Sequence, residues 1–292
     1  RTQIISLYMA LGGIPKYLTY GERGLSASQI INKVCFKGPL RDEFDELYSS
    51  LFEHYEHHVA IIRALSNRNQ GLTKSEISSA TGITAGGGMN RILDDLEQSG
   101  FILVVPTMGK LKKDLRYRLQ DEYSLFYLRW IERAKTVNIG GIDANFWLNI
   151  EGSAESRAWA GYAFEGICMK HLATIKEALG ISGVSTHATG WFYRPKKLSA
   201  EKGTQIDLVI DRADNCINLC EIKLYKSRFL ISKAYENELR QKKSIFIEKT
   251  GTQKSIFFTF ITLYGINKEA GHFGIVDKEL IMDDLFLAAR PQ

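Results

Sequence analysis

The fold of this chain is decided by Gln205-Ile206-Asp207-Leu208-Val209-Ile210-Asp211 and, after a short polar break, Cys216-Ile217-Asn218-Leu219-Cys220-Glu221-Ile222-Lys223. Both runs are largely apolar, and the turn-forming Ala213-Asp214-Asn215 separates them, so they predict two adjacent β-strands. Alternate residues of a strand share a face, which places Glu221 and Lys223 on the same face as Ile217 and Leu219. Charges there need a partner, a metal ion or a water-filled cleft, because desolvating an unpaired ion is costly.

The two strands bring Asp207, Glu221 and Lys223 into one neighbourhood. Two carboxylates and an amine can hold a hard divalent cation and direct a water molecule at a phosphodiester. The same residue types also form ordinary solvated salt bridges across a hairpin, and the three residues alone do not decide between these two interpretations.

Length and composition set the frame for this site. A chain of 292 residues with 45% hydrophobic content can bury substantial cores and is expected to form two or more domains. The net charge of +5 permits contact with nucleic acid without requiring it. The sequence starts at Arg1 in the middle of a helical pattern, so we expect it to be part of a longer protein.

The cysteines and the apolar runs indicate a compartment. The four cysteines lie in apolar surroundings with no CxxC pair, which favours reduced thiols in a cytoplasmic protein and argues against a zinc site. No apolar run approaches the roughly 20 residues needed to span a bilayer, so we expect no membrane contact.

The first half of the chain is predicted to be mainly helical. Residues 1–50 predict a small helical subdomain, and residues 51–120 predict three helices followed by a hairpin. Thr73 and Glu76 have the spacing of a capping box for the second of these helices, and Thr84 is expected to start the third. Three helices and a hairpin in this order are typical of a winged helix-turn-helix.

A winged helix suggests DNA as a partner. The third helix carries Asp94, Asp95 and Glu97, whose charges oppose a phosphate surface and disfavour sequence-specific reading. Two other segments are basic and are predicted to contact the nucleic-acid backbone, the hairpin with Lys110, Lys112, Lys113, Arg116 and Arg118 and the loop before Asp207 with Lys196 and Lys197. The alternative is a winged helix that serves only for packing or protein contact.

The second half predicts a different class of fold. Residues 121–152 predict a helical connector capped by Asp121, and residues 153–292 predict a helix, three strands, a helix and a strand. The central strands are apolar on both faces, which indicates a sheet covered by helices. The fold class expected from the sequence is therefore an α/β C-terminal domain preceded by a mainly helical region with a winged helix.

The αβββαβ order with Asp207, Glu221 and Lys223 on its second and third strands resembles the PD-(D/E)XK nuclease superfamily. Ala163-Phe164-Glu165-Gly166-Ile167-Cys168 is similar to the first-helix glutamate motif of that superfamily. The resemblance implies that Asp207 and Glu221 are ligands of Mg²⁺ or Mn²⁺. It also implies that Lys223 orients or activates the attacking water, and that Glu165 acts directly or through water.

The chain as a whole also resembles the part that lies downstream of the nucleotide-binding core in archaeal and bacterial AAA+/STAND-type ATPases. The segment Leu11-Gly12-Gly13-Ile14-Pro15-Lys16-Tyr17-Leu18 resembles their lid, and no Walker A or Walker B sequence is present. The resemblance implies an upstream ATPase domain in the same full-length protein, and this chain itself is not expected to hydrolyse ATP.

Three hypotheses about function follow from these observations. The first is a DNA-processing module with a metal-dependent, endonuclease-like domain. The second is a non-catalytic DNA-binding or regulatory module of such an ATPase, and the third is a scaffold for protein interactions. The sequence leaves open the form of the nucleic acid and the oligomeric state.

Overall fold

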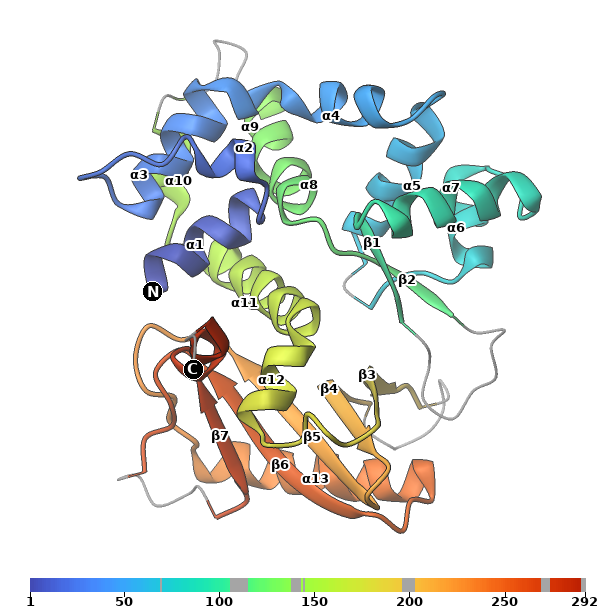
Figure 1. Cartoon of the computed structure of the whole chain (residues 1–292), viewed down its shortest axis with the longest axis vertical. Coiled ribbons are helices and arrows are strands. Elements are labelled where there is room, and N and C mark those ends of the chain that lie inside the picture. Colours follow the sequence, from blue (N-terminus) through green and yellow to red (C-terminus); the bar gives the residue numbers. More distant parts are fainter. Residues whose placement is uncertain are drawn as a thin grey trace. The chain divides into compact units, whose positions relative to one another are not determined.

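A computed structural model describes residues 1–68, 70–105, 115–137, 143, 145–195, 203–268 and 274–289. The chain forms two compact units, and the boundary falls inside one long helix, between Ala163 and Phe164. The first unit is mainly helical, and the second is a mixed α/β unit built on a five-stranded sheet (Figure 1). No described helix is both long enough and apolar enough to cross a membrane.

The first unit contains ten α-helices in its described part, the last of which precedes the long boundary helix. They are α1 Thr2–Leu11, α2 Pro15–Leu18, α3 Ala27–Ile31, α4 Glu43–Leu51, α5 Glu56–Ser66, α6 Lys74–Thr81, α7 Gly87–Gln98, α8 Glu122–Phe126, α9 Glu132–Val137 and α10 Phe146–Ile150. Two π-helical segments, η1 Asn32–Lys37 and η4 Tyr127–Ile131, and one 3₁₀ turn, η2 Pro39–Arg41, lie between them.

Side-chain caps explain where several of these helices begin. The Thr73 hydroxyl accepts a hydrogen bond from the Glu76 N–H while the Glu76 carboxylate accepts one from the Thr73 N–H, which confirms the predicted capping box. Asp121 caps α8 as expected. The predicted start of the third helix at Thr84 is wrong, because α7 begins at Gly87 after an extended Gly86. The backbone of Gly86 lies outside the helical region, so the helix cannot extend back through it to Thr84.

The first unit also holds one antiparallel hairpin among its described residues. Strand β1 Ile102–Val105 pairs with β2 Arg116–Leu119, and Leu72 forms a bridge with Tyr117 of β2. Gly71, just before this bridge, has φ +70°, and a Cβ there would lie 2.5 Å from the Tyr117 carbonyl oxygen. Only glycine fits this approach of two backbones.

The second unit is a sheet with helices on both faces. The strands are β3 Thr186–Tyr193, β4 Thr204–Arg212, β5 Cys216–Lys223, β6 Ser255–Thr262 and β7 Lys278–Ile281, in this spatial order. The first three run antiparallel to one another, whereas β5, β6 and β7 run parallel. The helices are α11 Ala154–Lys170, of which Phe164–Lys170 belongs to this unit, α12 Leu172–Ala178, α13 Lys233–Thr250 and the 3₁₀ helix η5 Asp284–Ala289.

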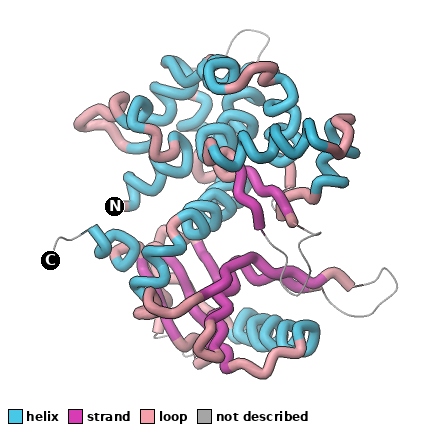
Figure 2. Tube along the Cα trace, turned by 45° about the vertical axis from the view of Figure 1, so that its right-hand side comes forward, coloured by secondary structure: helices cyan, strands magenta, loops and turns pink. Residues whose placement is uncertain are grey.

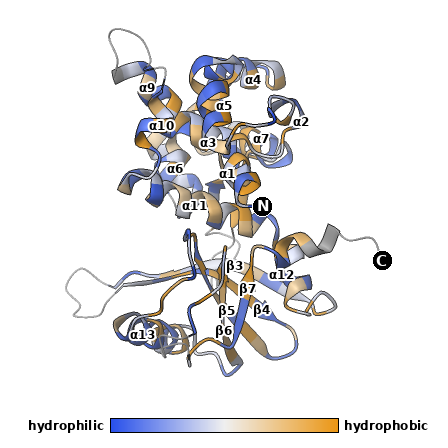
Figure 3. Ribbon diagram, turned by 90° about the vertical axis from the view of Figure 1, so that its left-hand side faces the viewer, coloured by the Kyte–Doolittle hydropathy of each residue, from blue (hydrophilic) through white to orange (hydrophobic). Residues whose placement is uncertain are grey.

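Helices α12 and α13 lie on opposite faces of the sheet (Figures 1 and 2). Between the sheet and α13 lies a core in which Leu219 and Phe260 from the strands are fully buried together with Leu239 and Phe246 from the helix. Figure 3 shows apolar residues along the strands and many hydrophilic ones on α13. Covering both faces is what the apolar character of β4 and β5 requires.

The structure confirms both predicted central strands and the turn between them, in which Asn215 has φ +63°. The helix expected at the start of the domain is split by a break at His171 into α11 and α12. Strand β7 was not predicted from the sequence.

Candidate functional site

Asp207 lies in a β-bulge of β4. Thr189 of β3 pairs with Val209 of β4, but Trp191, two residues further along β3, pairs with Ile206, so β4 carries one extra residue between these pairs. Gly190 stands opposite, where a Cβ would lie 3.4 Å from the Asp207 carbonyl oxygen. A bulge interrupts strand pairing, and Asp207 is one of the two β4 residues between these pairs that have no partner on β3.

The pairing of β4 with β5 opens next to this bulge. The paired residues run only as far as Leu208 with Cys220, although both strands continue past them. Beyond that point Asp207 Oδ2 accepts a hydrogen bond from the Ile222 N–H at 3.0 Å, so a side chain takes the place of a strand partner. N–H and C=O of one residue face the same neighbouring strand, and we therefore expect the Ile222 carbonyl to face this gap as well.

Glu221 lies beside the gap and is fully buried. Its Oε1 accepts from the Lys242 ammonium at 2.8 Å, and its Oε2 accepts from the Tyr235 hydroxyl at 3.0 Å and lies 3.2 Å from Lys223 Nζ. Tyr235 and Lys242 both come from α13, which covers this face of the sheet. A buried carboxylate requires such partners, since an unpaired one would be strongly destabilising.

Lys223 joins the two carboxylates. Its Nζ lies 3.7 Å from Asp207 Oδ2, and its side chain remains 27% exposed. We call Asp207, Glu221, Lys223, Tyr235 and Lys242 the Asp207 cluster. The structure thus brings together the three residues singled out from the sequence, with Lys223 within ion-pair distance of both carboxylates.

Burial and charge shift the protonation equilibria of the cluster. Burial and the neighbouring Glu221 charge raise the pKa of Asp207, although Lys223 and Lys242 both act to lower it. Burial acts to lower the pKa of Lys223, but attraction to Glu221 and Asp207 outweighs it, so that this pKa is raised. Lys223 therefore stays protonated at neutral pH.

Glu165, the predicted first-helix glutamate, lies half-buried on α11. Its charge is one of those that raise the pKa of Lys223 and of the buried Cys168 thiol. It is therefore electrostatically coupled to the Asp207 cluster.

A polar pocket of about 590 Å³ opens beside Asp207. It lies between the start of β4 and one face of α13 and is lined by Gly203, Thr204, Gln205, Asp207, Ala234, Asn237, Glu238, Gln241, Lys242 and Ile245. Asp207 and Lys242 belong to both the pocket and the cluster. A ligand in this pocket can thus reach the charged residues from solvent.

The Asp207 and Glu221 carboxylates could provide two oxygen ligands for a hard divalent cation. In the described part of the chain, no three His, Cys, Asp or Glu residues are grouped so that they could hold a metal ion. Burial is the main cause of the raised pKa of Asp207, and repulsion from the Glu221 carboxylate adds to it even though two ammonium groups lie nearby. A divalent cation would relieve this repulsion, and Mg²⁺ needs few protein ligands because it keeps several waters.

The residues predicted to contact nucleic acid do not form one exposed basic surface in the described part of the chain. Arg118 is buried, where its Nε donates to the Tyr162 hydroxyl and its guanidinium lies 4.5 Å from the Tyr162 ring centroid. Arg116 donates to the Gly71 carbonyl and pairs with Glu76. Lys110, Lys112, Lys113, Lys196 and Lys197 lie outside the described residues.

Sequence reasoning missed the bulge and the two partners from α13. The requirement for a partner of Glu221 was evident from its apolar face, but Lys242 is only one of several lysines that follow it. Comparison of the chain with protein-family models, with curated proteins and with solved structures finds no match.

Proposed function

We propose that the second unit hydrolyses phosphodiester bonds of DNA with the help of Mg²⁺ or Mn²⁺, as a PD-(D/E)XK nuclease-like domain. One observation carries this proposal: Asp207, Glu221 and Lys223 converge where two strands separate, beside an open polar pocket. The order of strands and helices in this unit and the coupling of Glu165 to the cluster support it further.

Asp207 and Glu221 would hold the cation, because carboxylate oxygens are the ligands that Mg²⁺ and Mn²⁺ prefer. When bound, such an ion supplies a water of lowered pKa and positive charge near the phosphate. Lys223 keeps its proton, so it orients the attacking water by donating a hydrogen bond and offsets charge on the phosphate oxygens; it does not act as a base.

The partners of Glu221 suggest how the site is kept intact before a cation binds. Lys242 and Lys223 neutralise the buried carboxylate in the structure. Lys242 and a cation are alternative counter-charges for Glu221, and Lys242 also lines the pocket from which a cation would enter. Glu221 already has Lys223, Tyr235 and Lys242 as partners without a cation. This observation favours a second candidate, a non-catalytic module in which the cluster only stabilises the fold.

The first unit is proposed to position DNA and to connect the second unit to an upstream ATPase domain. The order of α5, α6, α7, β1 and β2 is the order expected of a winged helix. Because Arg118 is buried and Arg116 is paired within the unit, any contact with the phosphate backbone has to come from other cations.

A cleavage assay with a metal-binding assay tests the proposal. DNA is incubated with the parent chain in Mg²⁺ or Mn²⁺, and Asp207→Ala and Lys223→Ala are expected to abolish cleavage. Asp211→Asn is the matched control, since Asp211 is on the same strand but pairs with Lys254 instead of the cluster. Calorimetry should show Mn²⁺ binding to the parent and loss of binding in Asp207→Ala. Equal cleavage by all variants would reject the assignment, and absence of both cleavage and Mn²⁺ binding would favour the non-catalytic module.

A further inference from the structure

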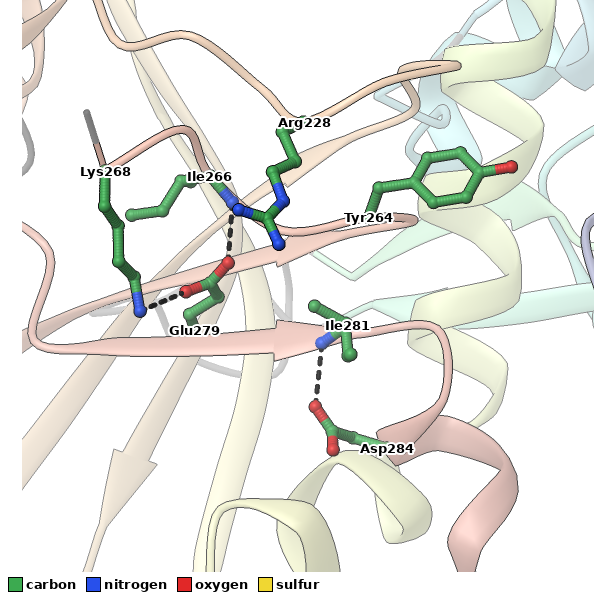
Figure 4. A pocket seen from close by; sticks show the side chains of 7 residues that line it. All are labelled: Arg228, Tyr264, Ile266, Lys268, Glu279, Ile281 and Asp284. Atoms are coloured by element: carbon green, nitrogen blue, oxygen red, sulfur yellow. Dashed lines mark hydrogen bonds and ion pairs between the residues drawn. The ribbon is translucent and has the colours of Figure 1, made fainter. Parts of the chain in front are cut away.

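A second pocket of about 320 Å³ lies at the ends of the parallel strands (Figure 4). It is lined by Arg228, Tyr264, Ile266, Lys268, Glu279, Ile281 and Asp284. Arg228 follows the end of β5, and Tyr264, Ile266 and Lys268 follow the end of β6. Glu279 and Ile281 belong to β7, and Asp284 is the first residue of η5. The carboxyl ends of parallel strands meet at one edge of a sheet, where α/β folds most often bind ligands.

The two carboxylates of this pocket are already used by its own wall. Glu279 accepts a hydrogen bond from the Ile266 N–H at 2.6 Å and lies 3.2 Å from Lys268 Nζ. Asp284 accepts from the Ile281 N–H at 2.8 Å. A Cβ at Gly265 would overlap Glu279 Oε1, so glycine at that position allows the carboxylate to close the wall.

Arg228 is the donor that remains available to a ligand. Within the described residues it makes no hydrogen bond or ion pair, and Figure 4 shows its guanidinium pointing into the pocket between Ile266 and Tyr264. A guanidinium offers a planar fork of donors that matches a phosphate or carboxylate. Because both carboxylates of the lining already have partners in the wall, Arg228 is the charged group of this pocket to which an anion can bind.

The sheet register gives the distance from this pocket to the Asp207 cluster. Lys223 pairs with Thr262 of β6, and Thr262 pairs with Ile281 of β7. Two strand spacings separate Lys223 from Ile281, which is about 10 Å between backbones. A single nucleic-acid strand at helical rise covers that distance in roughly three phosphates.

We propose that this pocket binds one backbone phosphate of a single-stranded segment of the substrate, a few nucleotides from the bond that is cleaved. The proposal rests on the proposed function, which makes nucleic acid the ligand. Tyr264, which is 43% exposed, lines the same pocket and offers a ring on which an unpaired base can stack. Arg228 holds the phosphate, and the strand then runs along the sheet edge towards Lys223.

The test measures binding of a single-stranded 12-nucleotide DNA to the full chain in EDTA, so that cleavage plays no part. Arg228→Ala is expected to weaken binding about tenfold, the loss of one charge-assisted contact, and to reduce the slope of log affinity against log salt by about 0.7. Arg228→Lys keeps the charge without the fork, so its slope should be unchanged while its affinity lies between those of the parent and Arg228→Ala. The matched control is Lys226→Ala, which removes an exposed cation two residues away that does not line the pocket. This variant should bind the DNA more tightly than Arg228→Ala does.

A neutral methylphosphonate linkage, moved one position at a time along the DNA, identifies the phosphate. In the parent chain, the methylphosphonate should weaken binding most at one position of the DNA. In Arg228→Ala, the linkage at that position should cause no additional loss of affinity. If no position stands out and inorganic phosphate competes instead, the pocket takes free phosphate and the proposal is wrong.

The outcomes also separate this inference from the proposed function. If Arg228→Ala behaves like Lys226→Ala while Asp207→Ala abolishes cleavage, the pocket assignment fails and the nuclease assignment stands. If the parent chain neither binds nor cleaves DNA, both fail. Arg228 is exposed, so its variants should keep the fold, which circular dichroism would verify.

Discussion

Replacing Lys242 by Met tests how the buried charge of Glu221 is balanced. The Lys242 ammonium lies 2.8 Å from Glu221 Oε1, and Glu221 is fully buried. Methionine fills a similar volume without the charge, so Lys242→Met leaves Glu221 with Tyr235 and Lys223 as its remaining partners. The contact of Lys242 with exposed Glu238 at 3.8 Å is also lost but contributes little.

The expected loss follows from burial. Removing one partner of a buried ion pair typically costs about 3–5 kcal/mol. Since Lys223 stays 3.2 Å from Glu221 and compensates in part, we expect a loss near the lower end, about 3 kcal/mol. Adding Glu221→Gln to Lys242→Met removes the uncompensated charge. The double variant should therefore lose less free energy of unfolding than the two single variants lose together, by about 2 kcal/mol.

Hydrogen exchange is the suitable assay, because the chain has two units and one overall unfolding temperature would mix them. The opening free energy is measured on a peptide covering β5. Lys233→Met is the matched control, since it makes the same change on the same helix, where Lys233 is 65% exposed and its partner Glu236 keeps its ion pair with Arg240 at 2.6 Å. Losses of equal size in both variants would refute the argument that Glu221 is a charged, buried group.

The same variant connects stability to the proposed cation. In the parent chain Lys242 and Mn²⁺ compete for Glu221, whereas in Lys242→Met the cation has no such competitor. Mn²⁺ at 100 times its dissociation constant should restore about 2.7 kcal/mol. No gain in exchange protection at any Mn²⁺ concentration would contradict a cation site at Glu221.

Two further changes test other parts of the reasoning. The pKa of Asp207 is raised, so the folded chain binds this proton more tightly than the unfolded chain, and Asp207 reduces stability as pH rises from about 4, the ordinary value, through its raised folded pKa. Asp207→Asn removes that penalty, so the stability of this variant relative to the parent should increase over this pH range and then level off. Urea denaturation of both chains at several pH values measures the difference in stability. A difference that does not change with pH would contradict the raised pKa of Asp207. Gly71→Ala should lower the stability of the β1–β2 hairpin by more than the roughly 1–2 kcal/mol expected from a positive φ alone, because its Cβ would meet the Tyr117 carbonyl. Gly82→Ala has a similar φ but open space around it, so hydrogen exchange in the first unit should show the smaller loss there, and equal losses would remove the steric argument.

Local patterns predicted much of the second unit. Two apolar runs and the polar turn between them define β4 and β5, and an apolar face that ends in Glu221 and Lys223 already implied that these charges need partners. Capping residues such as Thr73 and Asp121 fix helix starts through contacts within one turn, so they too can be recognised in the sequence.

What could not be predicted depends on contacts between distant segments. The bulge at Asp207 exists only relative to the pairing of β3, and the sequence of β4 alone does not reveal an extra residue. The choice of Lys242 as a partner depends on how α13 lies on the sheet. Arg118 belongs to a cationic segment in the sequence, yet its guanidinium is buried against Tyr162, because a long side chain can turn inward where a ring and a hydroxyl receive it.

Strand β5 is the point at which the architecture and the proposed chemistry meet. It pairs antiparallel with β4 and parallel with β6, and its pairing with β4 opens at Asp207. If the cluster served stability alone, apolar residues of similar volume would serve equally well, since buried ion pairs are seldom better than good packing. Instead, Lys223 is partly exposed and Asp207 borders a pocket, so the charges lie where a ligand can reach them. A cluster that stabilises the fold and a cluster that awaits a cation respond differently to Mn²⁺ in Lys242→Met, and this difference decides between them.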